Sequence, residues 1–256
     1  MSERQRSLWA GTLLALVFAA PLAVLALQAF ADSWRAPDAL PTDLGLRGFE
    51  VAFGRGGAED ALLNSLGIAI ATTALCLVIG WPAARTLAGK GLAGRGWIML
   101  LLALPLLMPP YLAGFGLTEW FIRLGIDGTL AGIVLAHVTF ALPYAIIVLI
   151  SGFGAELRRL EEMARASGAA RIATLRWVTV PSLRPALAVA GLLAFLVSWS
   201  QYGTTLAIGA GRSTLPIVML PFVRTDPQVA AALALLFLAP CVAALLAATR
   251  LGREAL

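Results

Sequence analysis

Six long apolar stretches constrain this chain more than any other feature of its sequence. A helix needs about 20 mainly apolar residues to cross a bilayer. The stretches are continuous and rich in Leu and Ala, whereas strands of a membrane barrel alternate in polarity over roughly ten residues. The sequence therefore predicts an all-α polytopic membrane protein with six transmembrane helices, at about residues 8–30, 61–84, 97–118, 129–151, 186–208 and 228–249.

Composition excludes an ordinary soluble domain, because only 13% of the residues are charged and 60% are hydrophobic, whereas soluble domains carry about 25% charged residues. The net charge of +5 does not indicate a nucleic-acid partner, since the basic residues are scattered through short loops without interleaved aromatics. One histidine, His137, and two isolated cysteines, Cys76 and Cys241, do not form a metal-binding pattern. We therefore expect membrane lipid around the chain, and neither a metal site nor a cofactor.

The distribution of basic residues predicts the orientation. If the N-terminus is cytoplasmic, thirteen of the 19 Lys and Arg residues lie on the cytoplasmic side, as the positive-inside rule favours. We therefore expect a multi-pass protein of a bacterial inner membrane with both termini in the cytoplasm. Arg4, Arg6 and the segment Ala29-Phe30-Ala31 also fit a cleaved signal peptide. A signal peptide has an apolar region of about 7–15 residues, so the longer run from Leu8 to Phe30 favours a retained anchor.

The chain divides into a first helix with its outer loop (1–60), a main membrane domain (61–249) and a tail (250–256). Glycines and prolines predict an irregular loop at 31–60. Asn64-Ser65 opens the second span or caps it, and Gly80-Trp81-Pro82 closes it. Prolines in 104–111 predict a bent or broken third helix that faces protein.

The only long cytoplasmic segment, 152–185, has its own helical pattern. Leu157, Leu160 and Ala164 recur at helical spacing among charged residues. Gly168 supplies a residue that tolerates positive φ, at which one helix stops and another starts. The pattern predicts two short amphipathic helices hinged at this glycine. A helix lying at the membrane interface is the alternative.

This segment resembles the "EAA" loop in the permease subunits of bacterial binding-protein-dependent (type I) ABC importers. The resemblance covers about 61–249. The family usually has Ala at position 163, Ile at 178 and Leu at 180, and all three departures stay apolar. The matching residues are Glu162-Met163-Ala164-Arg165-Ala166-Ser167-Gly168 and, after nine intervening residues, Val178-Thr179-Val180-Pro181.

The resemblance implies that the segment docks onto a separate ATPase and transmits force to the membrane domain. The partners it implies are cytoplasmic ABC ATPase subunits, a second permease subunit, identical or homologous, and an external solute-binding protein. The residues it assigns to ATPase coupling are Glu162, Ala164, Gly168, Val178, Val180 and Pro181.

The sequence offers little support for catalysis or for an energy source within the chain. The only lysine, Lys90, lacks the glycine pattern of a phosphate-binding loop, so ATP hydrolysis belongs to another subunit. Ser151 lacks the glycine that usually precedes a nucleophilic serine, and we expect no enzyme. An ion-coupled secondary carrier remains an alternative, with His137 as its only deep titratable group. A lone histidine in a helix is, however, more often a hydrogen-bonded packing residue than a proton relay. A polytopic interaction or assembly factor is the other alternative.

Polar residues near the end of the fifth span have two interpretations. Small and hydroxylated side chains can serve helix packing in membranes. On one continuous helix, Ser198, Gln201 and Thr205 would instead share a face that lines the substrate path, together with Tyr202. The segment 198–205 and the small size most resemble the branch that imports polyamines, iron(III), thiamine or phosphonates.

Overall fold

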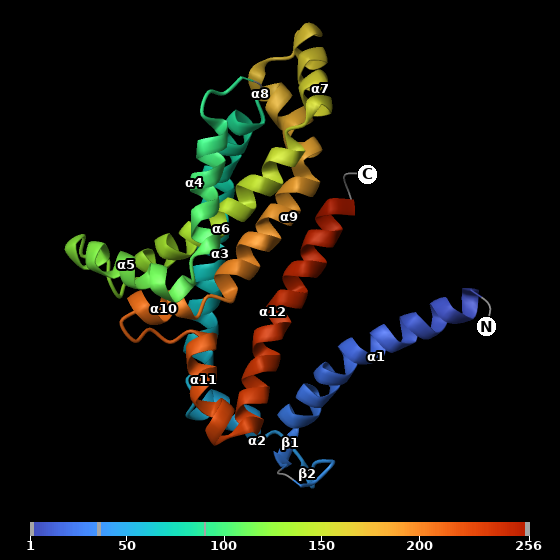
Figure 1. Ribbon diagram of the computed structural model, residues 1–256, viewed down its shortest axis with the longest axis vertical. Helices are drawn as coiled ribbons and strands as arrows, with labels where there is room; N and C mark the ends of the chain where they lie inside the picture. Colours follow the sequence, from blue (N-terminus) through green and yellow to red (C-terminus); the bar gives the residue numbers. More distant parts are fainter. Residues whose placement is uncertain (1–2, 35–36, 90, 254–256) are drawn as a thin grey trace. The chain divides into compact units, whose positions relative to one another are not determined.

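The computed structural model describes residues 3–34, 37–89 and 91–253, and these are almost entirely helical (Figure 1). The elements, in chain order, are α1 (Glu3–Ala29), β1 (Ala31–Ser33), β2 (Asp43–Leu44), α2 (Arg47–Gly54), α3 (Ala58–Ala88), α4 (Arg95–Leu107), α5 (Pro110–Arg123), α6 (Leu130–Gly152), α7 (Ala155–Ala166), α8 (Arg171–Thr174), η1 (Leu175–Thr179), α9 (Val180–Trp199), α10 (Gly203–Ile208), α11 (Leu215–Thr225) and α12 (Pro227–Arg253).

The helices confirm the predicted fold class. Among the described residues, five helices are long and apolar enough to cross a membrane, in α1, α3, α6, the continuous run from α8 to α9, and α12. A sixth span is present if α4 and α5 count as one, although they meet at an angle of 105°. The first, fourth and sixth predicted stretches agree with α1, α6 and α12 to within a few residues.

The proline-rich third stretch is broken, as expected. Met108 separates α4 from α5 with an extended backbone, φ −98° and ψ 135°. A residue before proline is driven out of the helical region by the proline ring, and Pro109 follows Met108 directly. Within the chain α4 buries no residue, whereas α5 buries Gly114 and Phe121.

The second span is longer than predicted at both ends. Helix α3 begins at Ala58, so Asn64 and Ser65 lie inside it and neither caps it. The carboxylates of Glu59 and Asp60 occupy its first turn, where the positive end of the helix dipole favours them. The helix also continues through Pro82 to Ala88, so the expectation that it closes at this proline was wrong.

The fifth span was predicted with the wrong bounds. Helix α9 ends at Trp199, and a separate short helix, α10, begins at Gly203. At its other end, α8, η1 and α9 form one continuous helical run from Arg171. The predicted second short helix of the 152–185 segment is therefore the start of the membrane span, joined to it through η1, a π-helical turn.

The loop at 31–60 is more ordered than its glycines and prolines suggested. It holds an antiparallel pair of short strands, β1 and β2, and the helix α2. The sequence also did not predict α11, a short apolar helix between the last two spans. The chain forms two compact units, Met1–Leu62 with Ser213–Ala239 and Leu63–Arg212 with Pro240–Leu256. The domain boundaries near residues 60 and 249 stay predictions.

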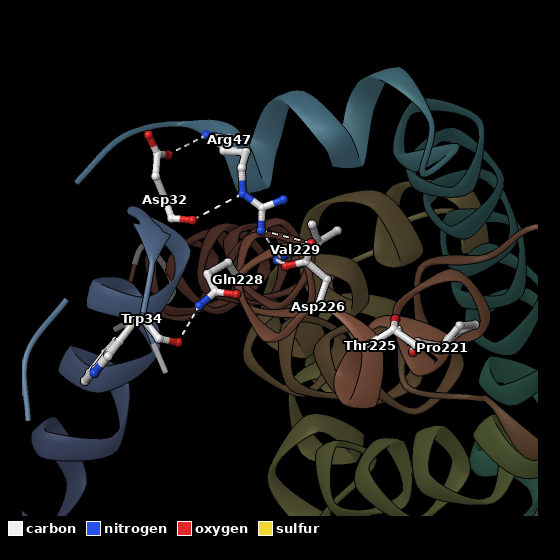
Figure 2. Close-up of polar contacts among 8 residues, drawn as sticks. All are labelled: Asp32, Trp34, Arg47, Pro221, Thr225, Asp226, Gln228 and Val229. Carbon is white, nitrogen blue, oxygen red and sulfur yellow. Dashed lines mark hydrogen bonds and ion pairs between the residues drawn. The ribbon is translucent and has the colours of Figure 1, made fainter. Parts of the chain in front are cut away.

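In the first unit, Arg47 joins the loop at 31–60 to the start of α12 (Figure 2). Its guanidinium donates to both carboxylate oxygens of Asp226 at 2.9 Å, while its backbone N–H donates to the Asp32 carboxylate at 3.0 Å. The Gln228 side chain donates to the carbonyl of Trp34 at 2.8 Å. A Cβ at Gly48 would lie 2.8 Å from the Gln228 carbonyl, so the glycine allows α2 to lie directly against α12.

In the second unit, α6 lies at the centre of the core, packed against α3 and α9. The contact between α6 and α9 is lined by small residues, as is common between membrane helices. A Cβ at Gly152 would lie 2.7 Å from the Ala186 Cβ. On the other side, Phe121, Ala136 and Ile208 form a smaller cluster in which α5 and α10 meet α6.

Candidate functional site

Helix α7 carries two adjacent glutamates with opposite environments. Glu161 is buried, with 5% of its surface exposed, and Glu162 is exposed. Successive residues of an α-helix point in different directions because one turn takes 3.6 residues. Leu157, one turn before Glu161, is also buried, whereas Leu160 is exposed. The buried face of α7 therefore carries a carboxylate at its centre, and the motif residue Glu162 faces outward.

Gly168 ends α7 in the way the sequence predicts. Its φ is +87°, a conformation that residues with a Cβ rarely adopt. Its N–H donates to the Arg165 carbonyl at 2.9 Å, and the Ala169 N–H donates to the Ala164 carbonyl at 3.0 Å. These two bonds form a Schellman motif, which satisfies the last carbonyl groups of a helix. The turn reverses the chain between α7 and α8.

The π-helical turn η1 ends two residues before Pro181. The Val180 N–H donates to the Leu175 carbonyl, five residues earlier. Proline has no N–H and disturbs the regular helical bonds around it, and π-turns are one way in which a helix accommodates such a site. Val178 is partly buried and packs on the core of the second unit, whereas Val180 is exposed. The motif residues 178–181 thus determine how the chain enters α9.

The buried carboxylate of Glu161 joins three elements. Its Oε2 accepts a hydrogen bond from the Arg85 guanidinium of α3 at 2.8 Å. Its Oε1 accepts from the Thr179 hydroxyl of η1 at 2.6 Å. Arg165, on α7 itself, donates to Oε2 at 3.2 Å. A charge can be buried only where partners of this kind replace the lost water, and here they come from three separate parts of the chain.

Further contacts reinforce this cluster. The Arg85 guanidinium lies over the Phe153 ring, 5.8 Å from its centre, and Trp81 meets the same ring edge-on. Arg158 donates to the carbonyls of Ala88 and Phe153, both at 3.2 Å. These carbonyls lie at the ends of α3 and α6, where a cation is favoured by the helix dipole. The base of α7 is therefore attached to the ends of two membrane helices.

Two open cavities flank the Arg85–Glu161 pair. One, of about 280 Å³, is bordered by Arg158 and Glu162, and the other, of about 350 Å³, by Arg171 and Thr174. Arg85, Glu161 and Arg165 line both. Among the described residues no group of His, Cys, Asp and Glu could hold a metal ion.

A second polar cluster lies inside the second unit, around His137 of α6. Its Nδ1 lies 2.9 Å from the Ser198 hydroxyl and its Nε2 lies 2.9 Å from the Thr205 hydroxyl. The Thr205 hydroxyl donates to the Gln201 carbonyl at 3.0 Å, so toward His137 it can only accept. The neutral ring with its proton on Nε2 satisfies this arrangement, with Ser198 donating to Nδ1.

The predicted stripe of Ser198, Gln201 and Thr205 is therefore not one face of a continuous helix. The helix breaks after Trp199, and His137 joins the residues before and after the break. All three side chains are buried within the chain, and Tyr202 is partly exposed. This arrangement suits the packing interpretation in the described conformation, and a substrate path stays a prediction.

Sequence reasoning singled out His137 but missed the contacts of Glu161 at the centre of the first cluster. Arg85 and Thr179 lie 76 and 18 residues from Glu161, and the EAA motif draws attention to Glu162 instead. The only local signal was the spacing of Glu161 and Arg165, which allows an ion pair one turn apart.

Comparisons with known proteins agree with the resemblance in the motif, although no family model matches the sequence. The molybdenum transport system permease protein ModB of Mycobacterium bovis is 36% identical over 197 residues, covering 70% of this chain and 74% of the relative. The putative 2-aminoethylphosphonate transport system permease protein PhnV of Salmonella typhimurium is 30% identical over 220 residues, covering 85% and 81%.

A solved structure has the same fold. It belongs to a bacterial ABC transporter involved in the import of the acidic polysaccharide alginate. The two chains superimpose with a TM-score of 0.73 and 17% sequence identity, and each is covered over 98% of its length.

Proposed function

This chain belongs to the permease subunits of type I ABC importers. We propose that it pairs with a second permease subunit and that the pair imports a small oxyanion, such as molybdate or a phosphonate. As a transport permease and not an enzyme, it works with a separate ATPase and a solute-binding protein.

We propose that the ATPase docks on the exposed face of the α7–α8 turn. Met163 is 58% exposed and Ile172 is 79% exposed, and both lie beside a charged surface that includes Glu162. Large exposed apolar side chains that lie among charged residues favour a protein cover. An ATPase surface with an apolar pocket and a basic residue for Glu162 would suit this face.

In this proposal the other motif residues determine the backbone conformation on either side of the docking face. Gly168 permits the turn that exposes the docking face, and Ala164 provides a carbonyl of the Schellman motif. Val178, Val180 and Pro181 define the start of α9, the helix that receives the motion. In this way the docking face and the membrane span are parts of one continuous segment.

We propose that the substrate path runs beside the break between α9 and α10. Tyr202 lies at the break and is partly exposed, whereas the nearby Ser198, Gln201 and Thr205 are buried. A break within a membrane segment is tolerated where it is buried in protein or lines a water-filled cavity. The second permease, identical or homologous, would complete such a cavity, and the conformational change driven by the ATPase would open it.

The basic loops support an orientation with both termini and the α7–α8 turn in the cytoplasm of a bacterial cell. This orientation places the docking face where ATP is present. It also directs the loop at 31–60 outward, toward the binding protein.

The substrate proposal rests on the two relatives, whose names refer to molybdenum and to 2-aminoethylphosphonate. Molybdenum dissolves in water as the tetrahedral oxyanion molybdate, and a phosphonate presents a similar anionic group. Among the substrates suggested by the sequence, phosphonate agrees with a relative's name. Neither relative is named for polyamines, iron(III) or thiamine.

Uptake by the assembled transporter tests this proposal. Vesicles containing this chain, its ATPase and a second permease, supplied with the binding protein, should accumulate labelled molybdate or 2-aminoethylphosphonate only when ATP is present. The neutral sugar trehalose serves as the control solute. Uptake of trehalose and of neither anion would show that the substrate class is wrong.

A further inference from the structure

We propose that Glu161, Arg85 and Thr179 form a positioning clamp, which makes the docking helix α7 move as one body with α3 and with the start of α9. The inference rests on the proposed function, because it concerns how motion of the ATPase reaches the membrane spans. The EAA motif does not identify the clamp, since its glutamate is the neighbouring Glu162.

The two oxygens of the Glu161 carboxylate bind different elements, which supports this inference. Each of its oxygens is used by a different element, Oε2 by Arg85 of α3 and Oε1 by Thr179 of η1. Arg165 also binds Oε2 but lies on α7 itself and is 55% exposed. Of the carboxylate's bonds, only those to Arg85 and Thr179 leave α7, so these two bonds can transmit force from α7 to α3 and to η1.

Burial explains why the clamp stays closed when α7 is pulled. The Glu161 side chain is only 6% exposed, so its carboxylate depends on Arg85 and Thr179 for most of its compensation. Separating a buried charge from its partner leaves it uncompensated, which is much more costly than breaking an exposed ion pair. Moving α7, α3 and η1 together avoids this cost. Arg158 adds a second attachment between α7 and the end of α3 through the Ala88 carbonyl.

The π-turn gives Thr179 its place in the clamp. Thr179 is 1% exposed and lies in the last position of η1, directly before α9. Its hydroxyl donates to the Glu161 carboxylate at 2.6 Å. Because η1 and α9 form one continuous helical run, a displacement of Glu161 is passed directly to α9. The far end of α9 carries Ser198, which binds His137.

Spin labels on α3 and α7 test the clamp in the complete transporter with its ATPase. Cys76 and Cys241 are first replaced by Ser, and labels are placed at Val78 of α3 and Ala166 of α7, both exposed. Labelled permease is diluted with unlabelled permease, so that only distances within one chain are measured. The distance distribution should be narrow and should not change when ATP is added.

Substitutions then separate the clamp from docking. In Glu161→Gln the distribution should broaden or shift with ATP, while the amount of copurified ATPase stays within about twofold of the wild type. Arg85→Ala should broaden the distribution in the same way, whereas Arg85→Lys should keep much of the narrow distribution. The double variant Arg85→Ala with Glu161→Gln should be no broader than either single variant, as expected when the two residues act as one unit. Glu156→Gln, an exposed carboxylate on the same helix, is the matched control and should match the wild type.

Each other result has a defined meaning. A wild-type distance that changes with ATP would show that α7 moves relative to α3, and the clamp would be refuted. An unchanged distance distribution in Glu161→Gln would also refute the clamp. If the distribution broadens and the ATPase is lost to the same extent, the carboxylate only maintains the docking surface, and the clamp is refuted as well. If the wild type itself does not bind an ATPase, the proposed function fails, and the inference fails with it.

Discussion

The Nε2 atom of His137 lies 2.9 Å from the Oγ1 atom of Thr205, although 68 residues separate them in the sequence. The same ring binds Ser198 through Nδ1, so one side chain of α6 spans the break between α9 and α10. All three residues are buried. The histidine therefore replaces, for its two partners, the hydrogen bonds that water would otherwise provide inside the membrane domain.

Replacing His137 with Phe should destabilise the purified permease by about 1–2 kcal/mol, because two buried hydroxyl groups lose their partner and bonds of this kind contribute modestly in membranes. Thermal unfolding in detergent measures the loss. Thr139→Ala is the matched control, since Thr139 is exposed on the same helix and bonds only to the Leu135 carbonyl one turn away. Equal stability of the two variants would show that the His137 bonds are not important for the fold.

Replacing Gly168 with Val should weaken ATPase binding. The φ of +87° costs a β-branched residue about 1–3 kcal/mol, and no atom lies within 4 Å of the added Cβ. The defect would therefore come from the backbone alone. Gly168→Asn should bind the ATPase nearly normally, because Asn tolerates this conformation.

Copurification of the ATPase measures this effect. Gly154→Ala is the control at the other end of α7, where φ is −69° and a Cβ can be added without strain. A Gly168→Val permease that binds as well as the wild type would contradict the role assigned to the turn.

Replacing Glu162 with Lys should reduce both ATPase binding and uptake, since the substitution inverts an exposed charge on the proposed docking face. Coupling free energies between sites commonly correspond to about 5–150-fold, and we expect an effect of at least the lower value. Membrane insertion should be unaffected. Glu156→Lys changes the same kind of side chain at the start of α7 and should have the smaller effect; the reverse order would place docking elsewhere.

Thiol labelling tests the proposed substrate path. In a background with Cys76 and Cys241 replaced, Tyr202→Cys should react with a small water-soluble reagent, and its reaction should depend on ATP. Cysteines at Ser198, Gln201 and Thr205 should react only in the state that opens the break, because these positions are buried in the described conformation. Val189→Cys on α9 is an exposed control within the span. If Val189→Cys reacts as strongly as the four path positions, or if none of those four reacts in any state, the substrate path is lined by other helices.

Reporter fusions test the orientation. A reporter that works only in the cytoplasm should be active after Leu256 and inactive when inserted near Leu40, because basic loops favour the cytoplasmic side. The opposite pattern would move the α7–α8 turn to the side without ATP and would remove the coupling mechanism.

Helix ends show where sequence reasoning fails for this protein. Pro82 was expected to end a span, yet α3 continues through it to Ala88, and the end of that helix is held by Arg158. The fifth span was expected to continue to residue 208, yet it ends at Trp199. At both places the structure has contacts with residues far away in the sequence, which local propensity does not describe.

By itself the sequence determined the membrane-spanning character of the chain, the bend near Pro109 and the turn at Gly168, because the bilayer imposes a length on apolar segments and because proline and glycine act on their own backbone. The family motif also follows from local spacing. Only the tertiary structure decided which of two adjacent glutamates is buried, since that depends on where Arg85 and Thr179 lie when α3 and η1 pack beside α7. The same holds for His137, whose partners are brought together by the packing of α6 against α9 and α10.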